Sequence, residues 1–350
     1  MRRTMRRTMR PAPSSAPHVP SAAHAFMDDT HDDSHWSPPP FVRGPSVRDL
    51  ARPEHFARAV AILAARHGLA GDTSPYPTGS DVVWRVGEHV VKLGAPVFAS
   101  QMDAEAAWLA HVAGRLGVAT PRVVARGELS GWPYLVMTRV GGVALGDLWP
   151  TLERRERERL CEHIGAFIAR LAAFEPPSFA PPWEPFAVEA RRASRARREH
   201  DAARGAVDAA LVASVESFLA AHACDGDSFP DDGTRVCLHT ELLGAHLLVD
   251  TTDADLPLCA AIDFADARVG PRDHDVVPLP EFVLKGERGL LRRILLARGD
   301  PASSLTEAKS AELLAHALTH RYASLPRLVA ACPQPVSDAR ELVSLFRTTE

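Results

Sequence analysis

Two neighbouring stretches of the sequence decide the fold: CLHTELLGAHLLVD (237–250) and AAIDFADARVGPRDHD (260–275). Each contains a short apolar run that leads into a loop with acidic and histidine side chains. Short apolar runs bounded by such loops predict strands, and a rigid sheet holds the side chains at its strand ends in place while leaving them accessible. The two stretches therefore predict a functional site at the ends of neighbouring strands.

These stretches resemble the aminoglycoside phosphotransferase and choline kinase superfamily. The catalytic loop of that family reads H-G-D-x-x-x-x-N, and His239, Glu241 and His246 occupy its three defining positions. The metal loop of the family reads I-D-F or I-D-W with a second Asp twelve residues later, which is the spacing of Asp263 and Asp275. The resemblance implies an α+β fold of the bilobal protein-kinase-like kind. In that fold a small antiparallel-sheet N-lobe with one main helix precedes a mostly helical C-lobe.

The resemblance extends over most of residues 75–345 and assigns a nucleotide site to the N-lobe. It implies that Lys92, in the strand VVKLG, binds the α- and β-phosphates of ATP. It also implies that Glu105 forms an ion pair with this lysine. Ser80 belongs to the turn 78–81, which would lie over the phosphates. Lys92 is unusual in this chain, since only three of the 40 Lys and Arg residues are lysines.

The strand WPYLVMTRV (132–140) resembles the last N-lobe strand and the hinge of the family. The resemblance implies that the backbone of Met137, Thr138 and Arg139 binds adenine. This strand and the Arg-rich segment 191–204 are also similar to the hygromycin kinase branch, which gives a hint about the substrate.

Phosphoryl transfer requires three things of a protein. A cation must contact the phosphates, oxygen ligands must hold a divalent metal ion, and a carboxylate must orient the attacking hydroxyl. The resemblance assigns these tasks to Lys92, Asp263 and Glu241, with His246 as a second metal ligand. His239 is expected to bond the backbone of the catalytic loop, and Asp275 to support that loop. The implied cofactors are ATP and Mg²⁺, with Mn²⁺ as the alternative.

Two of the three defining residues depart from the family pattern, because Glu241 replaces the catalytic Asp and His246 replaces the metal-binding Asn. Glutamate keeps the charge but adds one C–C bond, about 1.5 Å of reach. Histidine offers a nitrogen where Mg²⁺ prefers oxygen, whereas Mn²⁺ accepts imidazole more readily. Both departures bear on whether the chain is active.

The sequence therefore predicts an ATP-dependent O-phosphotransferase that acts on a hydroxyl of a small molecule, such as an aminoglycoside-like antibiotic or an amino alcohol, with antibiotic resistance as the associated role. A catalytically weakened, nucleotide-binding pseudokinase is the first alternative. A metal-dependent hydrolase built on His239, Glu241 and His246 is a more remote one, since the sequence has no H-E-x-x-H motif.

The composition fits a globular protein and excludes disorder throughout: 46% of the 350 residues are apolar, 24% are charged, and the formal net charge is -4. The near-zero net charge predicts that the protein binds neither nucleic acid nor a membrane. The expected partner is the small-molecule acceptor, and the expected state is a monomer or weak homodimer. No apolar run reaches the roughly 18–20 residues of a membrane span, which favours a cytoplasmic protein. The five cysteines are widely spaced and are expected to be buried thiols.

Three segments are expected along the chain: a disordered tail (1–46), a nucleotide-binding N-lobe (47–140), and a C-lobe with the catalytic and metal loops and acceptor-binding helices (141–346). In the N-lobe the apolar periodicity predicts helices over 53–67 and 100–116, and a hairpin turning at Gly87-Glu88. Further strands are expected over 122–127, 134–140, 235–239, 246–250 and 258–264. Helices are expected over 143–223 and 276–346.

Overall fold

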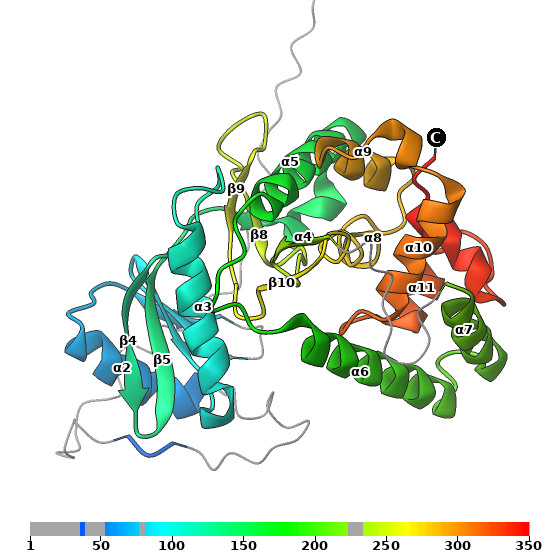
Figure 1. The fold of residues 1–350 in the computed structure, drawn as a ribbon. Coiled ribbons are helices and arrows are strands. Elements are labelled where there is room, and N and C mark those ends of the chain that lie inside the picture. The colour runs from blue at the N-terminus through cyan, green and yellow to red at the C-terminus, as the bar shows by residue number, and fades with distance from the viewer. Residues whose placement is uncertain (1–35, 39–52, 77–80, 223–233, 350) are drawn as a thin grey trace, which may run out of the picture. The chain divides into compact units, whose positions relative to one another are not determined.

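The computed structural model describes residues 36–38, 53–76, 81–222 and 234–349. In its N-terminal part the elements are α2 (Pro53–Arg66), β1 (Thr73–Pro75), β2 (Val82–Val86), β3 (His89–Leu93), η1 (Pro96–Phe98), α3 (Ala99–Val112), β4 (Val123–Leu129) and β5 (Trp132–Thr138). The five strands form one antiparallel sheet in the order β1-β2-β3-β5-β4. Figure 1 shows α3 beside the strands β4 and β5.

The predicted hairpin is confirmed, because β2 and β3 pair with Val86 opposite His89. The two residues between them are Gly87 and Glu88, and Gly87 adopts a φ of 57°. A Cβ atom at Gly87 would also lie 2.1 Å from the carbonyl oxygen of Ala70. The turn therefore requires glycine both for its left-handed backbone and for this close approach.

Successive side chains along the strands point to opposite faces of the sheet, so they belong to two separate hydrophobic layers. Trp132, Tyr134 and Val136 of β5 join a core with α2, whereas Leu135 and Met137 face the core that contains α3. Such alternation is the period of two expected for a strand packed on both faces. The sheet thus carries α2 on one face and α3 on the other.

The predicted tail 1–46 lies outside the described residues except for positions 36–38. Trp36 departs from the prediction for this segment, since its side chain is only 4% exposed. Its ring lies 5.7 Å from that of Phe56 and 6.0 Å from that of Trp132, measured between centroids. A large aromatic surface finds enough apolar contact here to be ordered, although the sequence around it has no periodicity.

The helix predicted over 100–116 is confirmed in its first part but is four residues too long, because α3 ends at Val112. Ala113 is extended, with a ψ of 122°, and Gly114 has a φ of 69°. The apolar stripe continues to Leu116, which is fully buried although it lies outside the helix. The apolar periodicity alone therefore overestimated the length of the helix.

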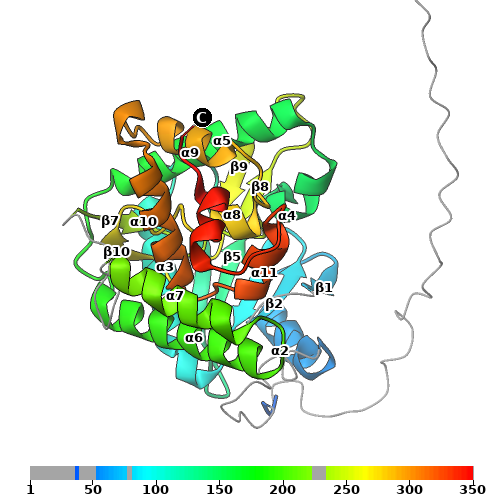
Figure 2. The ribbon, with the colours of Figure 1, turned by 90° about the vertical axis from the view of Figure 1, so that its right-hand side faces the viewer.

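The C-terminal part is mostly helical, as predicted. Its helices are α4 (Leu145–Leu148), η2 (Trp149–Thr151), α5 (Arg154–Ala172), α6 (Trp183–Ala203), α7 (Ala209–Ala221), α8 (Leu279–Phe282), α9 (Leu290–Ala297), η3 (Ala302–Ser304), α10 (Glu307–Leu318), α11 (Leu325–Ala331) and η4 (Ala339–Phe346). Figures 1 and 2 show α6 and α7 beside the C-terminal helices α10 and α11. None of these described helices, nor those before them, is long and apolar enough to cross a membrane.

Short strands lie among these helices. They are β6 (Val143–Ala144), β7 (Arg235–Leu238), β8 (Leu247–Val249), β9 (Leu258–Ala261) and β10 (Arg268–Pro271). They form one sheet in the order β6-β8-β9 and a pair β10-β7. The predicted strands correspond to β7, β8 and β9, whereas β10 was not predicted and β6 lies where a helix was expected to begin. The α+β, kinase-like fold class is confirmed, and the division into lobes after residue 140 stays a prediction, since the described residues from Trp36 onward form one compact unit.

Candidate active site

Lys92 is buried at the centre of a cluster of charges. The alternation of β3 places Val91 and Leu93 in the core with α2 and turns Lys92 toward α3. Its ammonium lies 2.8 Å from Glu105 Oε2, 3.1 Å from Asp263 Oδ1 and 3.1 Å from Asp81 Oδ2. A lysine ammonium has three donors, so these three carboxylates can take all of them.

The pKa values of Glu105 and Asp263, two of these carboxylates, shift in opposite directions. Burial raises the pKa of Glu105 to about 7, and the attraction of Lys92 offsets this only in part. Burial also acts to raise the pKa of Asp263, but Lys92 and His246 outweigh it and hold that pKa below its usual range. For Lys92 itself burial acts to lower the pKa, but the three carboxylates raise it well above the ordinary value. The predicted pair of Lys92 with Glu105 is thus present as an ion pair inside a larger group.

The loop after β7 is held by the buried carboxylate of Asp275. The backbone N–H of His239 donates to Asp275 Oδ2 at 2.8 Å, and that of Thr240 donates to Oδ1 at 2.7 Å. Thr240 has a φ of 69°, a conformation that costs energy for a β-branched residue and needs such support. Burial raises the pKa of Asp275 to about 6, although both amides act to lower it. This geometry agrees with the supporting role predicted for Asp275.

His239 is completely buried, and the protein backbone uses both of its ring nitrogens. Nε2 donates to the carbonyl oxygen of Ile262 at 2.9 Å, and Nδ1 accepts from the N–H of Glu241 at 3.3 Å. Burial, with His246 as the second cause, lowers the pKa of His239 to about 4, so the ring is neutral at pH 7. His239 therefore ties the loop of Glu241 to the loop of Asp263 and has no nitrogen left for a metal.

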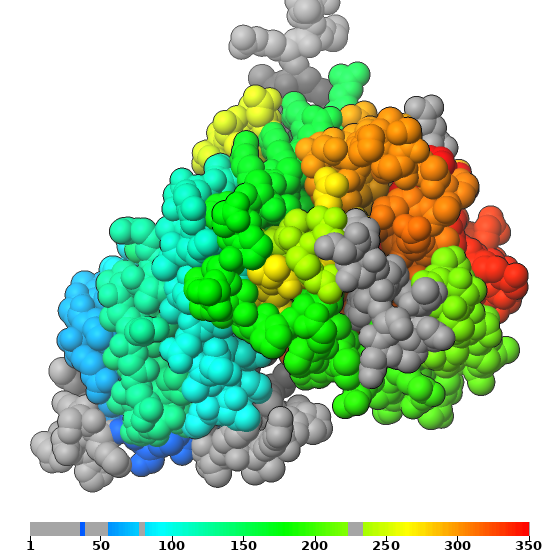
Figure 3. All heavy atoms as spheres, in the orientation of Figure 1, coloured from blue at the N-terminus to red at the C-terminus, as the bar shows by residue number. Residues whose placement is uncertain are grey.

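The Glu241 carboxylate is largely buried beside the segment that follows α10. The phenol of Tyr322 donates to Glu241 Oε1 at 2.6 Å, and Arg321 lies 3.9 Å from the same oxygen. Arg321 is closer to Asp266, at 2.6 Å. Burial and the neighbouring Asp266 raise the pKa of Glu241 to about 9, with Tyr322 acting in the opposite direction. Figure 3 shows yellow-green and yellow segments around residues 235–275 reaching the surface between green and orange ones.

Glu241, His246 and Asp263 form a group that could hold a metal ion, since one ligand atom of each lies within 4.8 Å of the others. Nδ1 of His246 lies 2.7 Å from the carbonyl oxygen of Glu241 and must donate to it. In the neutral ring Nε2 then carries the lone pair, and it lies 3.6 Å from Asp263 Oδ2. A lone pair beside a carboxylate is unfavourable without a proton or cation between them, so the donor set fits a divalent ion. Two carboxylates and an imidazole suit Mn²⁺ as well as Mg²⁺.

The predicted adenine contacts are restricted by hydrogen bonds within the protein. The N–H of Thr138 donates to the carbonyl oxygen of Arg122 at 2.9 Å, and the N–H of Arg139 donates to that of Glu88 at 2.8 Å. The N–H groups of Thr138 and Arg139 are therefore not free to bind adenine. Adenine binding by the backbone of Met137 and by the carbonyl groups of this segment stays a prediction. Ser80, predicted to cover the phosphates, lies outside the described residues.

Sequence reasoning missed several residues that contact the predicted ones. They are Tyr322, Arg321, Asp266 and His320, whose ring Nε2 bonds the carbonyl oxygen of Thr240 at 3.2 Å. Tyr322 lies 81 positions after Glu241, and no local pattern connects the two. The one available signal was composition, since Tyr322 is one of only three tyrosines in the chain.

Comparison with known proteins indicates the family of the chain. A family model described as a phosphotransferase enzyme family matches residues 74–313, which is more than half of the chain. No curated protein matches the sequence. The similarity to the hygromycin kinase branch stays a prediction.

Several solved structures of phosphotransferases share the fold. The GDP and kanamycin complex of APH(2'')-IIIa has a TM-score of 0.59 at 19% identity, covering 74% of this chain and 87% of that one. APH(3'')-Id from Streptomyces rimosus has a TM-score of 0.55 at 16% identity, covering 76% and 98%. The streptomycin–ATP complex of APH(2'')-IIa has a TM-score of 0.53 at 15% identity, covering 74% and 86%. At these identities the structures show the fold alone, whereas the family model identifies the sequence: the chain belongs to the phosphotransferase enzyme family.

Proposed function

We propose that this phosphotransferase uses ATP with a divalent metal ion to phosphorylate a hydroxyl group of a small molecule. The observation that carries the proposal is the convergence of two groups on Asp263. One carboxylate oxygen contacts the ammonium of Lys92, and the other lies beside the predicted metal ligand His246. A triphosphate with its metal needs this combination of a fixed cation and metal-binding carboxylates.

Each side chain has a task that its environment supports. Lys92, held by Glu105, would bind the phosphates, and Asp263 with His246 would hold the metal ion. The metal would supply neutralisation of the charge on the phosphates. Glu241 would orient the acceptor hydroxyl and take its proton, since a carboxylate within hydrogen-bond reach is suited to that role. His239 and Asp275 would keep the loop of Glu241 in place through the backbone.

One observation favours the pseudokinase alternative. Burial and the neighbouring Asp266 raise the pKa of Glu241 to about 9, which favours the protonated form, and that form cannot accept a proton. A divalent cation bound beside it would lower this pKa, because an opposite charge favours the ionised carboxylate. The two functions therefore differ in whether metal binding brings Glu241 into its ionised form.

Nucleotide binding is the first test, because both functions require it and a metal hydrolase does not. Lys92→Ala should weaken ATP binding by at least tenfold, measured by calorimetry with Mg²⁺ present. Lys285→Ala is the matched control, since Lys285 is an exposed lysine that makes no ion pair within the described residues. No ATP binding by the parent protein, or equal affinity in parent and Lys92→Ala, would refute the proposed nucleotide site.

Turnover is the second test, measured as acceptor-dependent ADP release with Mg²⁺ or Mn²⁺ and a panel of hydroxylated antibiotics and amino alcohols. His246→Asn replaces the imidazole by an oxygen ligand and should shift the metal preference toward Mg²⁺. An identical preference in both proteins would show that His246 does not bind the ion. ATP binding without any turnover would favour the pseudokinase.

A further inference from the structure

The segment His320–Tyr322, which follows α10, makes three consecutive contacts with the two loops of the candidate site. Nε2 of His320 lies 3.2 Å from the carbonyl oxygen of Thr240, in the catalytic loop. Arg321 forms a 2.6 Å ion pair with Asp266, in the metal loop. The phenol of Tyr322 donates to Glu241 Oε1 at 2.6 Å. One short piece of chain thus contacts both loops, and its last residue contacts the proposed catalytic carboxylate directly.

Among these contacts, only the phenol makes a short bond to Glu241. Arg321 is 3.9 Å from the same oxygen and is engaged by Asp266. Tyr322 is a donor at every ordinary pH, because burial and the charge of Glu241 raise its pKa far above the usual value. Nδ1 of His320 accepts from the N–H of Tyr322 at 3.3 Å, which helps to fix the backbone that carries the phenol.

A glutamate needs this kind of support more than a shorter acid would. Its side chain has one more rotatable bond than that of aspartate, so its carboxylate can occupy more positions, and fixing it costs conformational entropy. Misplacement of a reacting group by about 1 Å can lower a rate on the order of 100-fold. The backbone fixes only the base of the side chain, through the bonds of the Glu241 carbonyl oxygen to Leu243 and His246. The tip of the side chain needs a separate anchor.

We infer that Tyr322 is the positioning residue for Glu241: its phenol holds the carboxylate where the acceptor hydroxyl must meet it. This inference rests on the proposed function. Tyr322 does not touch the reacting atoms, and it acts only through Glu241. Its removal should therefore lower kcat while leaving the KM for ATP unchanged, and its effect should depend on the length of the side chain at position 241.

The kinetic test is a double-mutant cycle of Tyr322→Phe with Glu241→Asp in the full chain. Tyr322→Phe should lower kcat about tenfold in the parent and less than twofold in Glu241→Asp, because the shorter side chain does not reach the phenol. Tyr134→Phe is the matched control, because it removes another phenol that is bonded to a side chain. Tyr134 lies in β5, and its hydroxyl is 3.0 Å from Nε2 of His67, in the turn after α2. An unchanged kcat in Tyr322→Phe, or equal losses in both backgrounds, would overturn the inference.

A second measurement does not depend on turnover. The chain has three tyrosines, Tyr76, Tyr134 and Tyr322, so carbon-13 labelling of the tyrosine Cζ atoms gives three signals. The signal lost in Tyr322→Phe belongs to Tyr322, and it alone should move in Glu241→Ala. If that signal does not move, the contact is absent and the inference fails. A parent protein that transfers no phosphate refutes the proposed function and the kinetic role of Tyr322 together, and the spectrum then shows whether the contact exists.

Discussion

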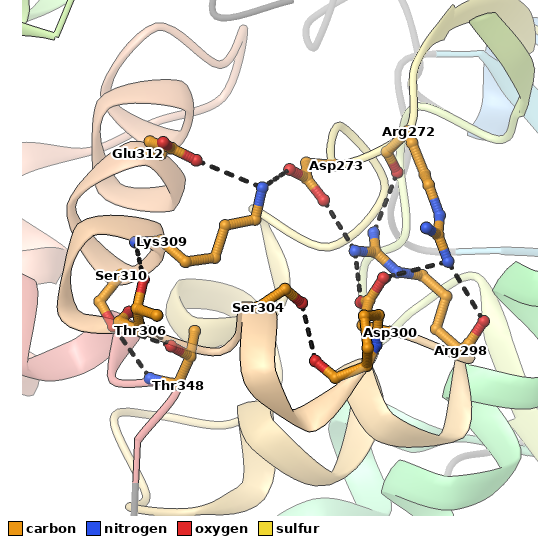
Figure 4. Close-up of polar contacts among 11 residues, drawn as sticks. Arg272, Asp273, Arg298, Asp300, Ser304, Thr306, Lys309, Ser310, Glu312 and Thr348 are labelled. Carbon is orange, nitrogen blue, oxygen red and sulfur yellow. Dashed lines mark hydrogen bonds and ion pairs between the residues drawn. The ribbon is translucent and has the colours of Figure 1, made fainter. Parts of the chain in front are cut away.

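Two of the ion-pair clusters among the described residues differ in charge balance. In the first, the ammonium of Lys92 faces three carboxylates, those of Asp81, Glu105 and Asp263, which leaves a formal excess of two negative charges. In the second, shown in Figure 4, three cations meet three carboxylates. Its members are Arg272, Arg298, Lys309, Asp273, Asp300 and Glu312.

The difference is visible in the most deeply buried carboxylate of the first cluster, Glu105, when it is compared with Asp273 of the second. Burial raises the pKa of Glu105 to about 7, because Lys92 is shared with two other acids. Burial acts in the same direction on Asp273, but Arg298 and Lys309 outweigh it and lower the pKa to about 2. A balanced cluster can be a permanent part of the fold, whereas a buried excess of negative charge is costly unless a cation joins it. We therefore expect the balanced cluster to serve stability and the unbalanced one to serve binding.

The largest expected effect comes from breaking the balanced cluster. Arg298 is almost completely buried and contacts both Asp273 and Asp300, at 2.7 and 2.6 Å. Arg298→Leu leaves these carboxylates without their main partner and should lower the free energy of unfolding by about 3–5 kcal/mol. Urea denaturation measures this loss. Arg195→Leu removes an exposed pair on α6 and should cost well under 1 kcal/mol. A loss below 1 kcal/mol in Arg298→Leu would mean that the balanced cluster does not stabilise the fold.

The unbalanced cluster should instead make stability depend on pH. The pKa of Glu105 in the folded protein, about 7, lies above its ordinary value of 4.5. Folding therefore favours the protonated form, so this stability is fully present below pH 4.5 and is lost as the pH rises through 7. Glu105→Gln removes the titrating group. The parent should lose about 2–3 kcal/mol relative to this variant between pH 4.5 and pH 8, without metal or nucleotide.

Denaturation of both proteins at the two pH values tests this dependence, since the other titrating groups cancel in the difference. Asp103→Asn is the control, because Asp103 lies on the same helix and is exposed. A difference between parent and Glu105→Gln that does not vary with pH would contradict the charge excess as the source of the effect.

The two clusters also show what sequence can and cannot predict. Lys92, Glu105, Asp263 and Asp275 were predicted because each occupies a position in a short motif that resembles the family pattern. Arg298 is one of many arginines, and nothing near it in the sequence indicates that its partner Asp273 lies 25 positions earlier. Tyr322 and Trp36 are similar cases, since each is placed by contacts with distant segments. Local patterns therefore predicted the elements and the motif, whereas the support around the motif needed the tertiary structure.

The smallest effect concerns Asp81, and it shows whether the unbalanced cluster is arranged for a ligand. All three donors of the Lys92 ammonium can be taken by carboxylates, so a phosphate must displace one of them. Asp81 is the candidate, because Glu105 is almost completely buried and Asp263 is assigned to the metal. Asp81→Asn removes the competing charge and should raise the affinity for ATP about fivefold, roughly 1 kcal/mol. Calorimetry at constant salt measures this change, with the exposed Asp72→Asn as the control. If affinity falls instead, Asp81 helps to bind the nucleotide with its metal, and the excess of negative charge is itself part of the binding site.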